Sequence, residues 1–220
     1  MNVADHLNRS RSMDKAFAHL SAADPRLAFL IETYPKPEFE PHTNYYHELV
    51  DSIISQQLSV KAARTIEERF KNLFDDEFPS PTQILDKDIE ELRAVGLSRP
   101  KARYIQDLAA KILDGTIKFD AIDELSNDEI IAELTRVKGI GVWTVHMFLM
   151  FCMGRLNVLP TGDLGIRNGV AKLYDLDHIP TEREVEIIAE ENSWHPYESV
   201  ASWYIWQSLD NIPKPKSKQD

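Results

Sequence analysis

The sequence contains a single cysteine, Cys152, among 220 residues. One cysteine excludes an internal disulfide, a four-cysteine zinc site and a cysteine-ligated iron–sulfur cluster built from this chain. Cys152 lies in the apolar run 147–153, which favours a buried thiol over a reactive nucleophile. The seven histidines are scattered along the chain and lack the spacing of a side-chain metal site.

Long apolar runs are also missing. No stretch approaches the roughly 18 apolar residues that cross a bilayer. Residues 1–14 show no apolar core of a secretory signal. These absences predict a protein that has no membrane partner and works inside the cell.

Positive charge is scarce, because 25 lysine and arginine residues face 36 aspartate and glutamate residues, giving a net charge of −11. This balance repels phosphate and argues against a general nucleic-acid or anionic-membrane binder. The charge is unevenly spread, however. Segments 75–91 and 175–191 each carry seven acidic residues and one basic residue, whereas segments 99–111 and 137–172 each carry four basic residues and one acidic residue.

Alternation with period two, which marks half-buried strands, is rare, whereas apolar residues at steps of three and four are common. We predict an all-α fold with nine or ten short helices, one folded unit over residues 1–212 and a disordered tail over 213–220. Ser126 and Thr181 each precede a glutamate by three residues and so predict capping boxes. The helical patterns cover the ranges 45–74, 84–95, 101–113, 128–137, 142–153, 164–174, 182–191 and 197–209.

The most informative segment is Leu134-Thr-Arg-Val-Lys-Gly-Ile-Gly-Val-Trp-Thr144. One helix is predicted to end at the turn made by Gly139 and Gly141, and a second helix to begin at once. The glycines allow a tight turn and a close approach, and the first amides of the second helix favour an anion such as a DNA phosphate. A plain helical hairpin without a ligand is the alternative at this point.

A carboxylate follows this turn in the sequence. Nineteen residues after Gly141 comes the segment Pro160-Thr-Gly-Asp-Leu-Gly-Ile-Arg167, in which Asp163 stands where an apolar run gives way to a helix. A carboxylate in such a position is usually an N-cap that accepts hydrogen bonds from the first amides. Capping and catalysis are compatible roles, because both use the ionised carboxylate.

In this order the motifs resemble the helix-hairpin-helix DNA glycosylase superfamily, and within it the 3-methyladenine-DNA glycosylase II branch. Three further segments, 52–63, 95–105 and 194–206, carry the same resemblance, which runs from about Tyr46 to Leu209. It implies a compact, two-lobed helical fold with the hairpin at about 128–153 and the active site in the cleft between the lobes.

The resemblance implies that Asp163 is the catalytic aspartate. Trp143 stands where bifunctional relatives place a Schiff-base lysine, and an indole forms no imine. The implied activity is therefore monofunctional hydrolysis that excises 3-methyladenine and 7-methylguanine in base excision repair. A fixed carboxylate stabilises the positive charge that develops on the deoxyribose, and an alkylated purine is already cationic, so it leaves without a strong general acid.

Further site residues follow from the same resemblance. A flipped base would stack in a pocket of Trp143, Phe151 and Trp206, where aromatic rings favour a cation, although aromatic residues at helical spacing also form cores. His146 is either a core histidine or a pocket neighbour. Gln57 matches the intercalating position, whereas Gln56 is expected to fill a polar gap between helices. The residues expected to contact double-stranded DNA are Gln57, Leu58, Ser59, Lys138, Gly139, Gly141 and Thr144.

No cofactor is expected to be required. In relatives the hairpin also binds a monovalent cation through backbone carbonyls, and Thr135, Val137 and Ile140 match those positions, so a structural Na⁺ or K⁺ is expected there. The expected partner is double-stranded DNA with alkylated bases, bound by a monomer. The compartment would be the bacterial cytoplasm with its nucleoid or the eukaryotic nucleus.

Two positions depart from the family pattern and concern substrate range: Glu198 replaces a usual basic residue and Asn157 a usual acidic residue. The rival interpretations are a non-enzymatic helix-hairpin-helix DNA-binding protein, a bifunctional or mismatch-directed glycosylase, and an unrelated helical scaffold. Combined with the uneven charge, the glycosylase interpretation predicts a basic face centred on the hairpin and an acidic back.

Overall fold

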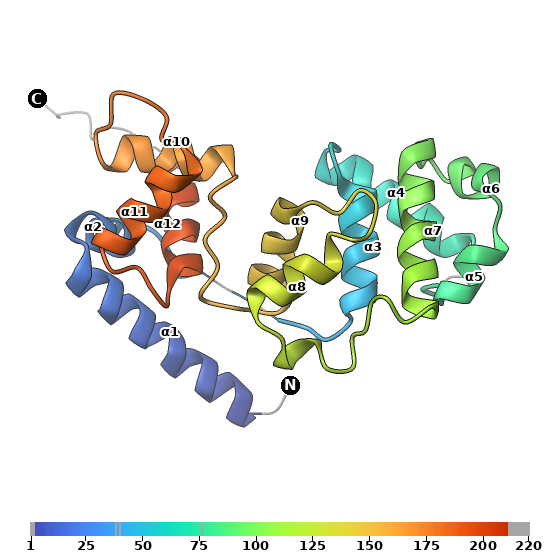
Figure 1. Cartoon of the computed structure of the whole chain (residues 1–220), viewed down its shortest axis with the longest axis horizontal. Helices are drawn as coiled ribbons and strands as arrows, with labels where there is room; N and C mark the ends of the chain where they lie inside the picture. Colours follow the sequence, from blue (N-terminus) through green and yellow to red (C-terminus); the bar gives the residue numbers. More distant parts are fainter. Residues whose placement is uncertain (1–2, 38, 40, 76, 211–220) are drawn as a thin grey trace, which may run out of the picture. The chain divides into compact units, whose positions relative to one another are not determined.

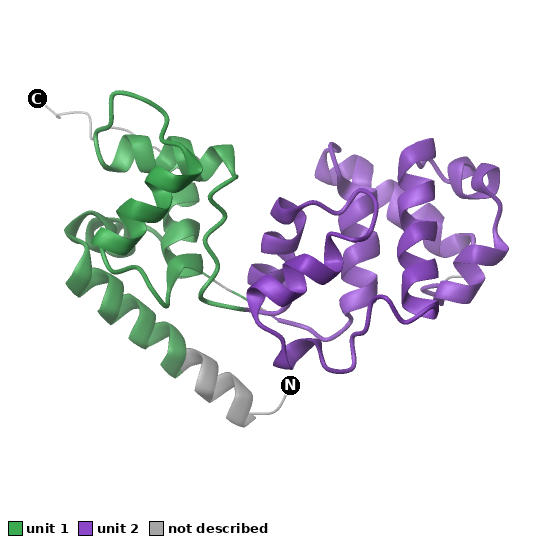
Figure 2. Ribbon diagram, viewed as in Figure 1, with its two compact units in different colours: residues 1–39, 155–220 green, residues 40–154 purple. Residues whose placement is uncertain are grey.

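The computed structural model describes residues 3–37, 39, 41–75 and 77–210, with side chains from residue 11 to residue 209 within those ranges. The predicted all-α class is confirmed, because the described residues form twelve α-helices, one 3₁₀-helix, one π-helix and no strand (Figure 1). None of these helices is long and apolar enough to cross a membrane. The predicted tail at 213–220 lies outside the described residues. The chain divides into two compact units (Figure 2).

The first unit comprises residues 1–39 and 155–220. Its helices are α1 (Val3–Ala23), α2 (Pro25–Thr33), α10 (Leu164–Leu173), α11 (Glu182–Glu191) and α12 (Glu198–Asp210). Their apolar faces meet in one core that buries Leu27, Ile166 and Tyr204 together with Trp194. Removing these side chains from water is the main favourable contribution to folding this unit.

Asp24 connects distant parts of this unit. It is the N-cap of α2, where its Oδ1 accepts hydrogen bonds from the backbone amides of Arg26 (2.9 Å) and Leu27 (3.3 Å). Its Oδ2 accepts from the indole Nε1 of Trp194 at 3.0 Å and from the hydroxyl of Tyr174. Burial, together with the hydrogen bond to Asp24, raises the pKa of the Tyr174 hydroxyl far above its ordinary value. A buried carboxylate with four donors therefore ties α2 to two later segments.

The second unit comprises residues 40–154. Its helices are α3 (Tyr45–Ser55), α4 (Val60–Asn72), α5 (Pro81–Asp86), α6 (Ile89–Ala94), α7 (Arg99–Leu113), η1 (Ile122–Glu124), α8 (Asn127–Leu134), α9 (Val142–Met147) and the π-helix η2 (Phe148–Cys152). Helix α3 packs against α4, α7 and η2, and its side chains Ile53 and Ile54 are fully buried. Cys152 is also buried, and burial raises the pKa of its thiol to about 12, so the predicted buried thiol is confirmed.

Two predicted helical stretches are each divided in the structure. The range 45–74 forms α3 and α4, because Gln57 adopts φ +56 and Ser59 caps a new helix. An L-residue in the left-handed region interrupts an α-helix, which apolar periodicity does not register. The range 84–95 is similarly divided between α5 and α6 by a capping box at Asp88. The predicted capping boxes at Ser126 and Thr181 are confirmed.

Candidate functional site

The predicted hairpin consists of α8, a loop over residues 135–141 and α9. Gly139 has φ +83, in the left-handed region that favours glycine. A Cβ atom at this position would lie 2.1 Å from Cδ2 of Tyr104 on α7, so the aromatic ring packs directly on the turn. The turn therefore needs glycine both for its backbone conformation and for space.

One polar side chain bonds to the turn, and a second bonds to the backbone at the end of α3. Nε2 of Gln56 donates to the carbonyl oxygen of Gly139 at 2.8 Å, which fits the gap-filling role predicted for Gln56. Nζ of Lys101 donates to the carbonyl oxygens of Ile54 (2.8 Å) and Gln56 (2.6 Å). A cation at the C-terminal end of a helix is favourable, and partial burial lowers the pKa of Lys101.

Lys138 is positioned by Asp107 of α7. The backbone amide of Lys138 donates to Oδ2 of Asp107 at 2.9 Å, and its Nζ lies 3.7 Å from Oδ1. Nζ of Lys111 donates to the same Oδ2 at 2.8 Å. Partial burial by itself raises the pKa of Asp107, but the hydrogen bonds from Lys111 and Lys138 hold that pKa below its ordinary value. The Lys138 side chain is still 74% exposed, so its ammonium group can also meet an anion.

Helix α9 begins at Gly141, which is its N-cap and supplies no side-chain acceptor. Apart from Gly141 itself and its neighbours along the backbone, no atom of the described chain lies within 4 Å of the place where a Cβ of Gly141 would stand. The helical backbone then continues without a break into η2. Trp143 is 51% exposed in the first turn, whereas Thr144 is buried.

The three carbonyl positions predicted for a cation lie in the hairpin loop. Thr135 is the C-cap of α8, and the side chains of Val137 and Ile140 are buried. The carbonyl oxygen of Val137 accepts the amide of Ile140 at 3.1 Å, and its second lone pair can meet an ion. Backbone carbonyls are ligands that monovalent cations accept in place of water, and the binding of Na⁺ or K⁺ by these three residues stays a prediction.

The turn between α3 and α4 contains Gln57, Leu58 and Ser59. Gln57 and Ser59 are exposed, and Leu58 is 39% exposed. Non-glycine residues in the left-handed region cluster at functional sites, which agrees with the intercalating role of Gln57. That role stays a prediction.

A cavity of about 950 Å³ lies in the second unit among α3, the turn that follows it, α7 and α9. Its lining also contains three carboxyl groups, those of Glu48, Asp51 and Glu67. Burial, aided by the charge of Glu67, raises the pKa of Asp51 to about 7. Of the predicted site residues, the cavity brings together Gln57, Leu58, Gly139, Trp143 and Thr144.

Asp163 is the N-cap of α10, as predicted. Its Oδ1 accepts a hydrogen bond from the backbone amide of Ile166 at 2.9 Å and another from the indole Nε1 of Trp206 at 2.9 Å. The structure thus places two predicted site residues, Asp163 and Trp206, in direct contact. The carboxylate is half-buried and is held by N–H groups from two different helices.

Gly165, in the first turn of α10, gives this arrangement its space. A Cβ at this position would lie 2.9 Å from Oδ1 of Asp163 and 3.1 Å from Nε1 of Trp206, which is too close for the hydrogen-bonded pair to stay in place. At Gly162 the nearest atom to an added Cβ is Oε1 of Glu182 at 3.7 Å, an ordinary contact.

Two candidate residues do not line the cavity, and three residues with contacts at the site were missed. Phe151 is 39% exposed in η2 and does not line the cavity, and His146 is half-buried and does not line it either. Sequence analysis did not identify Tyr104, Lys101 or Gly165 as site residues. All three lie within the segments that carry the family resemblance, but no spacing rule reveals their contacts.

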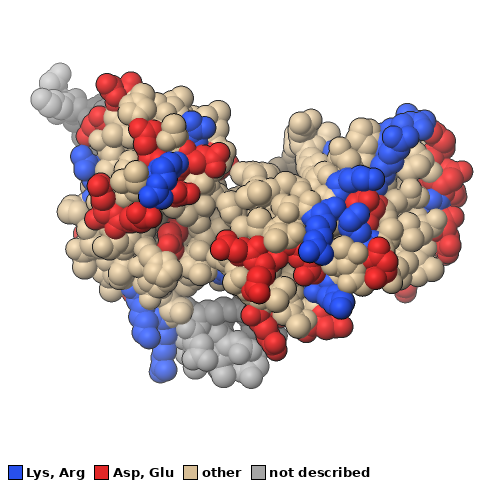
Figure 3. All heavy atoms as spheres, in the orientation of Figure 1, with Lys and Arg blue, Asp and Glu red and all other residues tan. Residues whose placement is uncertain are grey.

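The charge of the second unit is locally uneven. On the face shown in Figure 3, Lys and Arg side chains gather over α7 and the neighbouring hairpin turn, Asp and Glu side chains gather over α5 and α6, and a further acidic group lies over α8. This agrees with the uneven charge of segments 75–91 and 99–111. Ion pairs such as Lys111–Asp107 at 2.8 Å offset part of the basic charge.

A sequence profile of the HhH-GPD superfamily of base excision DNA repair proteins matches residues 50–194. DNA-3-methyladenine glycosylase 1 of Schizosaccharomyces pombe is 38% identical over 211 residues, which cover 93% of this chain and 92% of the relative. An alkylbase DNA glycosidase-like protein of the same yeast is 30% identical, with 94% of this chain and 97% of the relative covered.

Two solved structures are similar to most of the chain. The 3-methyladenine DNA glycosylase of Schizosaccharomyces pombe in complex with abasic DNA has a TM-score of 0.75 at 36% identity, with 92% of this chain and 100% of that chain covered. A DNA-3-methyladenine glycosidase from Bacillus halodurans has a TM-score of 0.78 at 34% identity, with 88% of each chain covered.

Replacing Gly139 with alanine should lower the free energy of unfolding by about 2–4 kcal/mol, because the new Cβ adds left-handed strain and collides with Tyr104. Chemical denaturation measures this loss. Gly141→Ala is the matched control on the same turn and should cost less than about 1 kcal/mol.

A Gly139→Ala/Tyr104→Ala double variant separates the two causes. It should show a favourable coupling between the substitutions, because removal of the ring abolishes the collision and leaves only the backbone strain. Additive losses would show that Tyr104 does not restrict the turn.

Proposed function

This chain belongs to the HhH-GPD superfamily of base excision DNA repair proteins. We propose that it is a monofunctional DNA glycosylase that releases alkylated purines from DNA by hydrolysing the bond between the base and the deoxyribose. Glycosylase activity on alkylated bases is supported by the likeness to DNA-3-methyladenine glycosylase 1 over 93% of the chain. The observation that carries the mechanism is the Asp163 carboxylate, held through Oδ1 by Ile166 and Trp206.

In the proposed reaction a water molecule adds to C1′ of the deoxyribose while the bond from C1′ to the base nitrogen breaks. The electron pair of that bond goes to the base and neutralises the positive charge that alkylation placed on it. One proton of the water is released, and the products are a free base and an abasic site. The base needs no protonation in order to leave, which suits a site with one fixed carboxylate.

Asp163 would stabilise the positive charge on the sugar as the bond breaks, and would orient or deprotonate the attacking water. A fixed charge is effective because its orientation is settled before the reaction begins. Trp206 is proposed to act in two ways, as a positioning residue that donates to Oδ1 and as an aromatic wall for the base.

The chemistry of the 950 Å³ cavity suits a cation rather than a phosphate. Its lining combines the carboxyl groups of Glu48, Asp51 and Glu67 with the aromatic rings of Trp143 and Tyr104. Aromatic faces attract cations, and purines alkylated at N3 of adenine or N7 of guanine are cationic. This supports the proposal that Trp143 contributes to recognition of the base.

Binding of the DNA strand is proposed to use the hairpin backbone. The first amides of α9 and the ammonium group of Lys138 would meet a phosphate, and a Na⁺ or K⁺ on the carbonyls of Thr135, Val137 and Ile140 would add positive charge there. Gln57 would fill the gap that the flipped base leaves. Contacts to phosphate and minor groove carry little sequence preference, so little preference for flanking sequence is expected. We propose that the protein acts as a monomer, in the compartment that holds the alkylated DNA.

Asp163→Asn should lower the rate of 3-methyladenine release by at least about a hundredfold, because the fixed charge is lost. Asparagine is as good an N-cap as aspartate, so the fold should be retained. Single-turnover release from methylated DNA measures the rate.

Affinity for DNA that contains a tetrahydrofuran abasic analogue is the control, and it should be unchanged in Asp163→Asn. Undiminished base release would contradict the proposed role of Asp163. Tight binding to the analogue without any base release by the wild type would favour a non-enzymatic DNA-binding protein.

Borohydride should trap no covalent complex between the wild-type protein and damaged DNA, because Trp143 stands where a lysine would form an imine. The reaction should leave an intact strand with an abasic site, which gel electrophoresis before and after alkaline cleavage distinguishes from a nicked strand. A trapped complex would assign lyase activity to the chain.

Gly165→Ala should lower the rate of base release by about ten- to a hundredfold, because the new Cβ displaces Asp163 and Trp206 from their hydrogen-bonded positions. Gly162→Ala, three residues away, is the matched control and should release bases at nearly the wild-type rate. Equal rates for both variants would show that the Asp163–Trp206 contact is not needed.

A further inference from the structure

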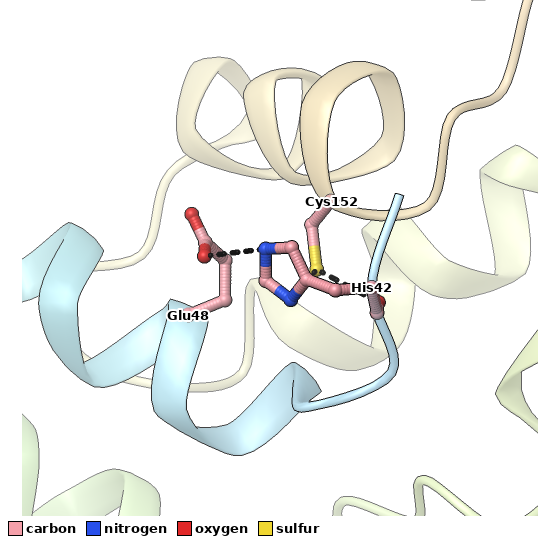
Figure 4. A group of neighbouring side chains, drawn as sticks. All are labelled: His42, Glu48 and Cys152. Carbon is pink, nitrogen blue, oxygen red and sulfur yellow. Dashed lines mark hydrogen bonds and ion pairs between the residues drawn. The ribbon is translucent and has the colours of Figure 1, made fainter. Parts of the chain in front are cut away.

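Away from the hairpin turn and from Asp163, three side chains with metal-binding groups gather in the second unit. His42 precedes α3, Glu48 lies in the first turn of α3, and Cys152 is the last residue of η2. Figure 4 shows the His42 imidazole between the Glu48 carboxylate and the Cys152 sulfur. One ligand atom from each residue lies within 4.8 Å of the ligand atoms of the other two.

The separation between sulfur and nitrogen is close to that of a tetrahedral metal site. Nδ1 of His42 lies 3.9 Å from Sγ of Cys152, and Nε2 of the same ring lies 3.1 Å from Oε2 of Glu48. Zinc bonds of about 2.3 Å to sulfur and 2.0 Å to nitrogen place these two ligand atoms about 3.5 Å apart. One ion can be bound by only one of the two ring nitrogens, so closing the three groups around it requires the Glu48 carboxylate or the His42 ring to turn.

The backbone around the cluster is firmly held. The amide of His42 donates to the carbonyl oxygen of Cys152 at 3.0 Å, and the thiol of Cys152 lies 3.7 Å from the carbonyl oxygen of His42. Pro41 packs on Gly154, where an added Cβ would lie 2.2 Å from its Cγ. Two segments that are 110 residues apart in the sequence are thus joined before any ion binds.

The three side chains differ in their freedom to move. Cys152 is buried, whereas the side chains of His42 and Glu48 are 49% and 39% exposed. The sulfur is therefore a fixed point, the other two ligands can turn toward an ion, and solvent can reach a fourth coordination position. Such a set of three protein ligands with one open position is a known form of zinc site.

We propose that His42, Glu48 and Cys152 bind one thiophilic divalent cation of the Zn²⁺ class, with water as the fourth ligand. Thiolate and imidazole together select a d-block ion over Mg²⁺ or Ca²⁺. The thiol proton passes to solvent as the sulfur–metal bond forms, and no electron is transferred. The proposed glycosylase reaction uses no such ion, although Glu48 also belongs to the lining of the 950 Å³ cavity.

The position of the cluster indicates what the ion does. His42 and Cys152 each lie within three residues of a point at which the chain passes from one unit to the other, at residues 39–40 and 154–155. An ion bound to both His42 and Cys152 would link the two connecting segments where they leave the second unit. It would therefore stabilise these segments, because it binds only the folded arrangement.

Co²⁺ titration of the metal-free, full-length protein tests the site. A thiolate–cobalt charge-transfer band should grow to one equivalent of Co²⁺, and Zn²⁺ should remove the band whereas excess Mg²⁺ should not. Cys152 is the only cysteine of the chain, so the band reports on this sulfur alone. Cys152→Ser should abolish it.

His42→Ala removes an exposed ligand without entering the core, so it keeps the test valid if Cys152→Ser folds poorly. It should weaken Co²⁺ binding by at least about tenfold. His178→Ala is the matched control, because His178 is an exposed histidine paired with the carboxylates of Asp177 and Glu184 but has no thiol beside it. It should bind Co²⁺ as the wild type does.

Absence of the charge-transfer band in the wild type would overturn the proposal. So would a band that His42→Ala leaves unchanged, or one that His178→Ala weakens equally.

Discussion

The proposed active site depends on one hydrogen-bonded arrangement, in which a single oxygen of Asp163 accepts N–H groups from two helices. The amide of Ile166 comes from α10 itself, and the indole of Trp206 comes from α12. Their two bonds fix the direction of the carboxylate and place it at the positive end of a helix. The site can then offer a fixed negative charge to a sugar that becomes cationic, without reorganising during the reaction.

Glycine makes this arrangement compatible with close packing. A side chain at Gly165 would occupy the space in which the Asp163 oxygen and the Trp206 nitrogen meet. Gly139 has the same role in the hairpin, because its backbone lies against the ring of Tyr104 and leaves no space for a side chain. At both places a missing Cβ lets a polar group be presented at a fixed position, and stability is supplied by packing from other helices.

The overall charge of −11 is reconciled with DNA binding by its distribution. Acidic residues concentrate in segments 75–91 and 175–191, and basic residues gather over α7 and the hairpin turn on the face shown in Figure 3, although α8 also carries acidic residues. The acidic groups that do lie near the hairpin, in the cavity lining, suit a cationic base. Repulsion from the rest of the protein would keep affinity for undamaged DNA modest and sensitive to salt.

Features governed by local rules could be predicted from the sequence. The capping boxes, the N-cap at Asp163 and the Gly-x-Gly turn each depend on residues within four positions of one another. Contacts between distant residues could not be predicted this way. Gln56 and Gly139 are 83 residues apart and His42 and Cys152 are 110 apart, so no periodicity connects them. The break at Gln57 was also missed, because a left-handed residue leaves the apolar spacing on either side unchanged.

Mass analysis of the bases that the wild-type protein releases from dimethyl-sulfate-treated DNA tests the central claim most directly. One fixed carboxylate acting on a cationic leaving group predicts free 3-methyladenine and 7-methylguanine, with the unmodified purines retained in the DNA. No release of methylated bases, or release of unmodified purines at a comparable rate, would contradict the account.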